Sequence, residues 1–64
     1  GKRLKELREE RGLTQKELAT LLHLNSVTYL RYEKAQRQPP LEVLADMAAF
    51  FGVTVDYLLG LTDY

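Results

Sequence analysis

The residues whose types and spacing could recognise a ligand lie together in Asn25–Lys34, which reads NSVTYLRYEK. A helix turns by about 100° per residue, so this stretch has two faces. One face carries two tyrosines and an acid, namely Tyr29, Tyr32 and Glu33. The opposite face carries aliphatic and cationic side chains, with a serine at its edge in the first turn: Val27, Leu30, Arg31, Lys34 and Ser26. Such donors and methyl groups suit recognition rather than bond breaking.

The chain offers little for catalysis or for metal binding. It has no cysteine and a single histidine, His23, so a disulfide and a thiolate zinc site are impossible. Glu33 has no second titratable group evidently placed to work with it, and a nucleophile–base pair and a phosphate-cradling glycine loop are both missing. We therefore predict that the protein is not an enzyme, and that it has no metal and no cofactor.

The net charge of zero conceals an asymmetry along the chain. Residues 1–38 hold all nine Lys and Arg against five acids, a net charge of +4, whereas residues 39–64 hold four acids and no Lys or Arg, a net charge of −4. The basic end could face an anion. Chance could also produce such a split in so short a chain.

Capping and turn residues divide the sequence into five short helices. Thr14 with Glu17 forms a capping box before the second helix, and Asn25 caps the third. The others are expected at Lys2–Arg11, about Leu41–Phe51 and Val55–Leu59, and residues 35–40 form a loop. Apolar stripes mark the inner faces: Leu4 and Leu7; Leu18, Ala19 and Leu22; Leu41, Leu44, Ala48 and Phe51.

Length and spacing set the expected architecture. Sixty-four residues make at most one small domain. About three residues, HLN, join the second and third helices, which is typical of a helix-turn-helix. We therefore predict that residues 1–64 form one compact all-α helix-turn-helix domain. Gly1 in place of Met is consistent with a longer natural chain.

Composition also bears on location. No apolar run approaches the roughly 20 residues that a membrane span needs, and the first residues are too charged for a signal-peptide core. The absence of cysteine fits a reducing cytoplasm. We predict a cytoplasmic protein with no membrane partner.

Three segments carry a family resemblance: RLKELREERGLTQKELA, TYLRYEKAQRQP and FFGVTVDYLLG. In sequence and order they resemble the phage repressor and Cro-like (XRE-type) helix-turn-helix family, over nearly the whole chain. The resemblance implies a five-helix bundle of the lambda-repressor type that binds double-stranded DNA as a homodimer on a two-fold operator. It further implies a bacterial or phage transcriptional regulator at the nucleoid, which represses by blocking a promoter. It allows a further C-terminal domain.

The family places its third helix in the major groove, with the tyrosine face inward. Ser26, Val27 and Arg31 match its base-reading positions. Arg31 can donate two hydrogen bonds to guanine, and Val27 can pack on a thymine methyl group. Leu30, beside them, is less usual in the family. It could be a second apolar base contact, cover the stem of Arg31 or Lys34, or bind another protein.

The phosphate contacts implied by the resemblance begin at the second helix. Thr14 and Gln15 match its start, where free amides attract an anion. Thr14 could be a plain cap as well, and Gln15 could be idle surface. Further backbone contacts, which carry no sequence information, are expected from Thr28, Lys34, Gln36 and Arg37. The alternative for Arg37 is a solvated loop charge.

Glu33 lies on the inward face, where a lone carboxylate is very costly. The family solves this with an arginine on the first helix, and Arg8 matches that position. The resemblance therefore implies an Arg8–Glu33 ion pair between the first and third helices.

Three residues depart from the family pattern. His23 replaces a glycine in the turn and is expected to take a positive φ, which histidine tolerates better than most residues. Ala35 also replaces a frequent glycine. Pro40 replaces the Ser or Thr that caps the fourth helix, so we expect that cap to be lost.

Apolar residues at the C-terminal end could form the dimer contact, since the family dimerises there: Val43, Phe50, Val55, Leu59 and Leu61. The alternative is ordinary packing of the fifth helix on the fourth. A rival function is a protein-interaction module that uses Val27 and Leu30. A small-molecule sensor would be expected to need a further domain beyond Tyr64.

Overall fold

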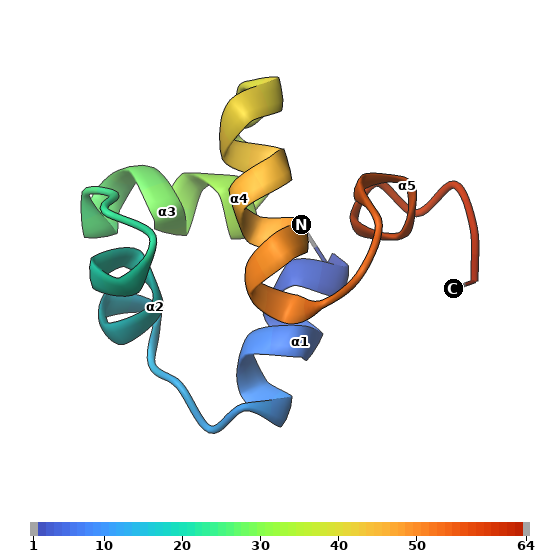
Figure 1. The fold of residues 1–64 in the computed structure, drawn as a ribbon. Helices are drawn as coiled ribbons and strands as arrows, with labels where there is room; N and C mark the ends of the chain where they lie inside the picture. The colour runs from blue at the N-terminus through green and yellow to red at the C-terminus, as the bar shows by residue number, and fades with distance from the viewer. Residues whose placement is uncertain (1, 64) are drawn as a thin grey trace.

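The computed structural model describes residues 2–63, and within this range it contains five α-helices and no strand (Figure 1). The predicted all-α architecture is confirmed. The first helix ends one residue before Arg11 and the fifth ends one residue before Leu59, so each is one residue shorter than predicted. The helices are α1 (Lys2–Glu10), α2 (Gln15–Leu21), α3 (Ser26–Glu33), α4 (Leu41–Phe51) and α5 (Val55–Leu58).

One apolar cluster draws buried side chains from all five helices. Its members are Leu4, Leu18, Ala19, Tyr29, Tyr32, Met47, Ala48, Phe51 and Leu58. The expected inner stripe of α4 is correct for Leu44, Ala48 and Phe51 but wrong for Leu41, which is 73% exposed. The first turn of α4 extends beyond the other helices (Figure 1), so the core does not reach Leu41.

The predicted caps are present at the helix starts. The Thr14 hydroxyl accepts from the Glu17 amide at 3.1 Å, and Glu17 Oε1 accepts from the Thr14 amide at 2.8 Å. This second bond lowers the pKa of Glu17. Asn25 Oδ1 accepts from the Val27 amide at 2.8 Å. Pro40 provides no side-chain cap for α4, as expected.

Two loop residues other than glycine adopt left-handed backbone angles. His23 has a φ of 58°, which confirms the expectation for the turn, and Ala35 has a φ of 55°. A residue with a Cβ pays roughly 1–2 kcal/mol for this conformation. Ala35 follows α3, so the strained backbone lies where the chain leaves the third helix.

Ala35→Gly is expected to raise the free energy of unfolding by about 0.5–1 kcal/mol. The relief of the left-handed strain exceeds the roughly 0.4–1 kcal/mol that glycine loses through a more flexible unfolded chain. Urea denaturation followed by circular dichroism measures the change. Ala45→Gly, on an exposed position inside α4, is the matched control and should lose about 1 kcal/mol. Equal losses from both substitutions would contradict the strain argument.

Two arginines of the N-terminal part hold the C-terminal helices. The Arg3 guanidinium lies 4.3 Å from the centroid of the Tyr57 ring, donates to the Tyr57 carbonyl at 3.2 Å and also donates to the Thr62 carbonyl. Arg11 donates to the Phe51 carbonyl at 3.3 Å, at the end of α4. These contacts tie α4, α5 and the segment after α5 to the start of the chain.

Candidate nucleic-acid interface

α2 and α3 are joined by a tight turn and lie together at one side of the molecule (Figure 1). The Leu24 amide donates to the Ala19 carbonyl at 2.8 Å, and the His23 amide donates to the Thr20 carbonyl at 3.1 Å. Leu22 and Leu24 pack against the core cluster. The turn therefore fixes the angle between the two helices with both backbone bonds and half-buried leucines.

The tyrosine face of α3 points inward, as expected. Tyr29 is completely buried and Tyr32 is 5% exposed. Because this face is anchored in the core, the opposite face of α3 is turned toward solvent.

The Glu33 carboxylate, on the inward side of α3, accepts hydrogen bonds from four donor atoms. Arg8 Nε donates to Glu33 Oε2 at 2.6 Å and Arg8 Nη2 donates to Oε1 at 3.3 Å. Gln15 Nε2 donates to Oε1 at 3.1 Å, and the Tyr29 hydroxyl donates to Oε2. Arg8 also donates to the Leu13 carbonyl at 2.7 Å. The network joins α1, α2 and α3 at one carboxylate.

The electrostatics of this network favour the charged pair. Burial by itself raises the pKa of Glu33, but the hydrogen bonds from Arg8, Tyr29 and Gln15 outweigh it, so the pKa of Glu33 is lowered. Burial, and then the hydrogen bond to Glu33, raise the pKa of Tyr29. The hydrogen bond to Glu33 likewise raises the pKa of Arg8. Glu33 is therefore an ionised structural anchor at neutral pH.

The outward face of α3 is open. Ser26 and Arg31 are exposed, and Val27 is 54% exposed although it is aliphatic. Thr28 is half-buried. Leu30 is also half-buried, yet it does not belong to the side chains that pack against the core cluster. Ser26, Val27 and Arg31, the three residues expected to read bases, thus lie accessible on one surface.

Unpaired cations border this face. Arg31, Lys34 and Arg37 are exposed, and none of them forms an ion pair with an acid in residues 2–63. Gln36 is exposed between them. The only acid from residue 25 to residue 38 is Glu33, whose negative charge is paired with Arg8 in the interior. The exposed part of residues 25–38 therefore carries positive charge that no acid of the same stretch offsets.

A family model described as helix-turn-helix matches residues 4–58. The chain belongs to this family. The relatives described below are transcriptional regulators and not enzymes, as predicted. The resemblance to XRE-type regulators is confirmed.

Three relatives illustrate the likeness. The HTH-type transcriptional regulator ImmR of Bacillus subtilis (strain 168) is 42% identical over 94% of this chain and 47% of its own length. The uncharacterized regulator YobD of the same organism is 41% identical over 95% and 54%. The cryptic phage CTXphi transcriptional repressor RstR of Vibrio cholerae is 39% identical over 91% and 52%. The chain spans about half the length of these curated relatives. No solved structure matches it.

The Gln15 side chain has a partner inside the protein that was not predicted from the sequence. Its amide donates inward to Glu33 and its side chain is half-buried, so it links the start of α2 to α3. Thr14 is exposed, and its hydroxyl is used in the capping box. Neither the Gln15–Glu33 bond nor the Tyr29–Glu33 bond was predicted from the sequence. The spacing of four residues from Tyr29 to Glu33 could have indicated the second.

The residues expected at a dimer contact fall into two groups. Val43, Phe50 and Val55 are half-buried and pack against the core cluster of the same chain. Leu59 is 43% exposed and Leu61 is 70% exposed. Packing on the core of the same chain therefore accounts for the first three, and the last two leave apolar surface uncovered.

The described residues, 2–63, contain no group of three or more His, Cys, Asp or Glu that could hold a metal ion. None of their helices has the length and apolar character that crossing a bilayer requires.

Proposed function

We propose that this chain binds double-stranded DNA sequence-specifically, with α3 in the major groove, and that it regulates transcription as a repressor. The supporting observation is the outward face of α3, where Ser26, Val27 and Arg31 are accessible beside cations that have no acidic partner within residues 2–63. An exposed valine beside an unpaired arginine matches a thymine methyl group and a guanine edge.

The proposal assigns separate tasks to the neighbouring side chains. Ser26, Val27 and Arg31 read bases, and Leu30 covers the stems of its cationic neighbours or adds an apolar contact. Backbone phosphates are bound by the start of α2 at Thr14 and by the exposed or half-buried groups that follow the base readers, namely Thr28, Lys34, Gln36 and Arg37. Gln15 takes part by orienting α2 through Glu33.

The proposed active form is a homodimer of residues 1–64 as one domain. Two copies would present their third helices about 34 Å apart, one turn of B-DNA. Leu59 and Leu61 are the candidates for the contact, because they are apolar and exposed. The assignment as a repressor draws on RstR, whose name states that activity.

Selection of bound sequences from a random DNA pool tests the proposal as a whole. It should return a two-fold motif whose half-sites are about 10 base pairs apart, and scrambled DNA should then compete poorly in a mobility-shift assay. Equal competition by selected and scrambled DNA would refute sequence reading. Salt-insensitive binding to a protein, with no DNA shift, would favour the interaction module instead.

Lys34→Gln is expected to weaken binding to all sequences evenly and to make the slope of log K against log salt less negative by about 0.9 per half-site. The reason is that a protein with one phosphate contact fewer displaces one counterion fewer from the DNA when it binds. Affinities at several salt concentrations measure the slope. Lys5→Gln, on the exposed surface of α1, is the matched control and should leave it unchanged. A change in base preference for Lys34→Gln would contradict a phosphate role.

A further inference from the structure

A hollow of about 170 Å³ lies among α1, α4, α5 and the loop at residues 35–40. Its floor consists of buried apolar side chains from three helices, namely Leu4, Leu44, Met47 and Leu58. Apolar cavities of about 150 Å³ bind benzene. The hollow can therefore take an apolar group of about that size.

Tyr32 provides an unused hydrogen-bonding group at the wall. It lines the hollow and is 95% buried, since only 5% of it is exposed. Its hydroxyl has no hydrogen-bond partner among residues 2–63, in contrast to that of Tyr29. Every fully enclosed side-chain oxygen or nitrogen of the described residues does have a partner, so the Tyr32 hydroxyl must reach open space. The hollow is the open space that this residue lines.

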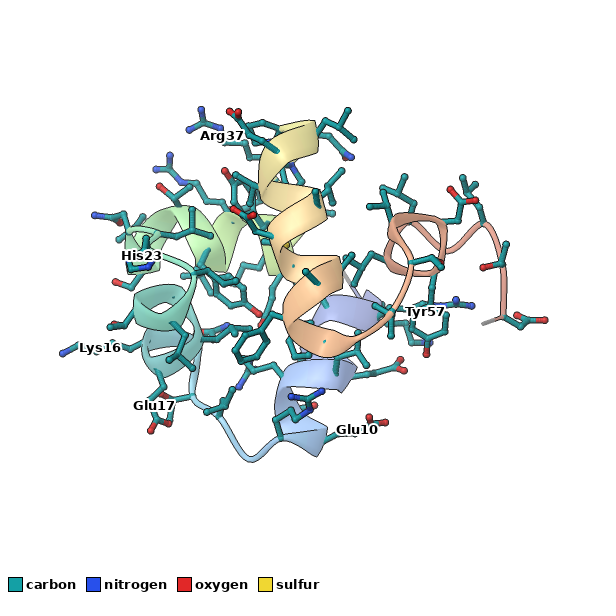
Figure 2. The ribbon with its side chains drawn as sticks, in the orientation of Figure 1. Glu10, Lys16, Glu17, His23, Arg37 and Tyr57 are labelled. Carbon is teal, nitrogen blue, oxygen red and sulfur yellow. The ribbon has the colours of Figure 1, made fainter. Side chains whose placement is uncertain are left out.

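Arg37 is the one cation among the residues that line the hollow. It lines the hollow from the loop, close to the first turn of α4 (Figure 2), and forms no ion pair within the described part of the chain. The lining contains no Asp or Glu. Guanidinium groups bind carboxylates through paired hydrogen bonds. The polar part of the hollow therefore offers donors and a positive charge to an anionic ligand.

We propose that the hollow binds a small carboxylate with an apolar body of about the size of benzene. The body rests on the leucine and methionine floor, and the carboxylate accepts hydrogen bonds from the Tyr32 hydroxyl and the Arg37 guanidinium. Tyr32 belongs to α3, and Arg37 is one of the proposed phosphate contacts. The effect on DNA rests on the proposed function: the bound carboxylate occupies Arg37 and thereby lowers the affinity for DNA.

The single methionine of the chain, Met47, lies in the floor and reports on the hollow directly. Phenylacetate titrated into the protein should shift the Met47 methyl resonance saturably, with a Kd on the order of 1 mM for so small a ligand. Phenylacetamide, which lacks the charge, and acetate, which lacks the body, should bind far more weakly.

Variants of the donors test the geometry. Tyr32→Phe and Arg37→Gln should each raise the Kd for phenylacetate about tenfold, because each removes a hydrogen bond to a charged group. Lys34→Gln removes the same charge from a residue that does not line the hollow and should leave the Kd unchanged. Amide spectra identify any variant that fails to fold. Arg37 lies at an exposed loop position, so Arg37→Gln keeps the test decisive if Tyr32→Phe fails to fold.

Several results would overturn the inference. These are equal binding of phenylacetate and phenylacetamide, or no Met47 shift when phenylacetate is added. The DNA part is measured separately, as the affinity for selected DNA with and without phenylacetate. An unchanged DNA affinity despite probe binding would refute only the coupling, and absence of DNA binding would refute the proposed function while the Met47 result still decides the site.

Discussion

Glu33→Ala is expected to lower the free energy of unfolding by about 3–5 kcal/mol, because it leaves the Arg8 guanidinium charged in the interior without its partner. The side chains of Arg8 and Glu33 are only 10% and 3% exposed. The substitution also removes the acceptor for Gln15 and for the Tyr29 hydroxyl. A domain of this length has a total stability of roughly 3–10 kcal/mol, so much of the variant should be unfolded at 37 °C. Urea denaturation at low temperature measures the loss.

Controls separate the ion pair from a general sensitivity of the fold. Glu9→Ala, at an exposed acid on α1, should change the stability by no more than about 0.5 kcal/mol. The double variant with Arg8→Ala and Glu33→Ala should lose less than the sum of the single losses, since the second removal takes away an already unpaired charge. A Glu33→Ala midpoint close to that of the wild type would sink the interpretation.

Acid should expose the same contribution without a substitution. The folded pKa of Glu33 is lowered, so ionised Glu33 stabilises the fold fully above its unfolded pKa of about 4.3 and loses this effect as the pH falls through the folded value. The stability difference between wild type and Glu33→Gln should accordingly narrow below about pH 4. A difference that stays constant between pH 7 and pH 3 would contradict the assignment.

The helices and caps could be predicted because their causes are local. Thr14 with Glu17, and Asn25 with the next amides, form bonds between residues two or three apart in the chain. The left-handed φ of His23 was implied by the family resemblance, because His23 stands where the family usually has a glycine. Periodicity failed at Leu41 because it identifies a face of a helix but not how far along that face the core extends.

The parts of the site that sequence missed depend on how distant elements meet. Gln15 reaches Glu33 across 18 positions of sequence, which no local pattern encodes. Leu30 is half-buried although a helical wheel puts it on the outward face, because burial depends on neighbouring side chains as well as on direction. The hollow lined by Tyr32 and Arg37 likewise exists only where residues of the loop come together with residues of α1, α4 and α5.

Arg31→Ala is expected to abolish the preference for one base pair in each half-site, at about 1–3 kcal/mol or roughly 5–150-fold per half-site. Arg31 is exposed on the outward face of α3 and has no acidic partner among residues 2–63, so its planar fork is available for a guanine edge. The anchors of α3 lie on its other face, so the fold should survive the change.

This effect is measured by the affinities for the selected DNA and for DNA in which each base pair is replaced in turn by the other three. Arg31→Ala should bind all four bases at one position alike while retaining its preferences elsewhere, whereas Lys34→Gln should weaken every sequence by the same factor. The contrast matters because both variants lose one positive charge and both cations belong to the same open surface. If Arg31→Ala also weakened every sequence evenly, Arg31 would be a phosphate contact. Base reading would then have to come from Ser26 and from Val27, whose exposed side chain offers only methyl contacts.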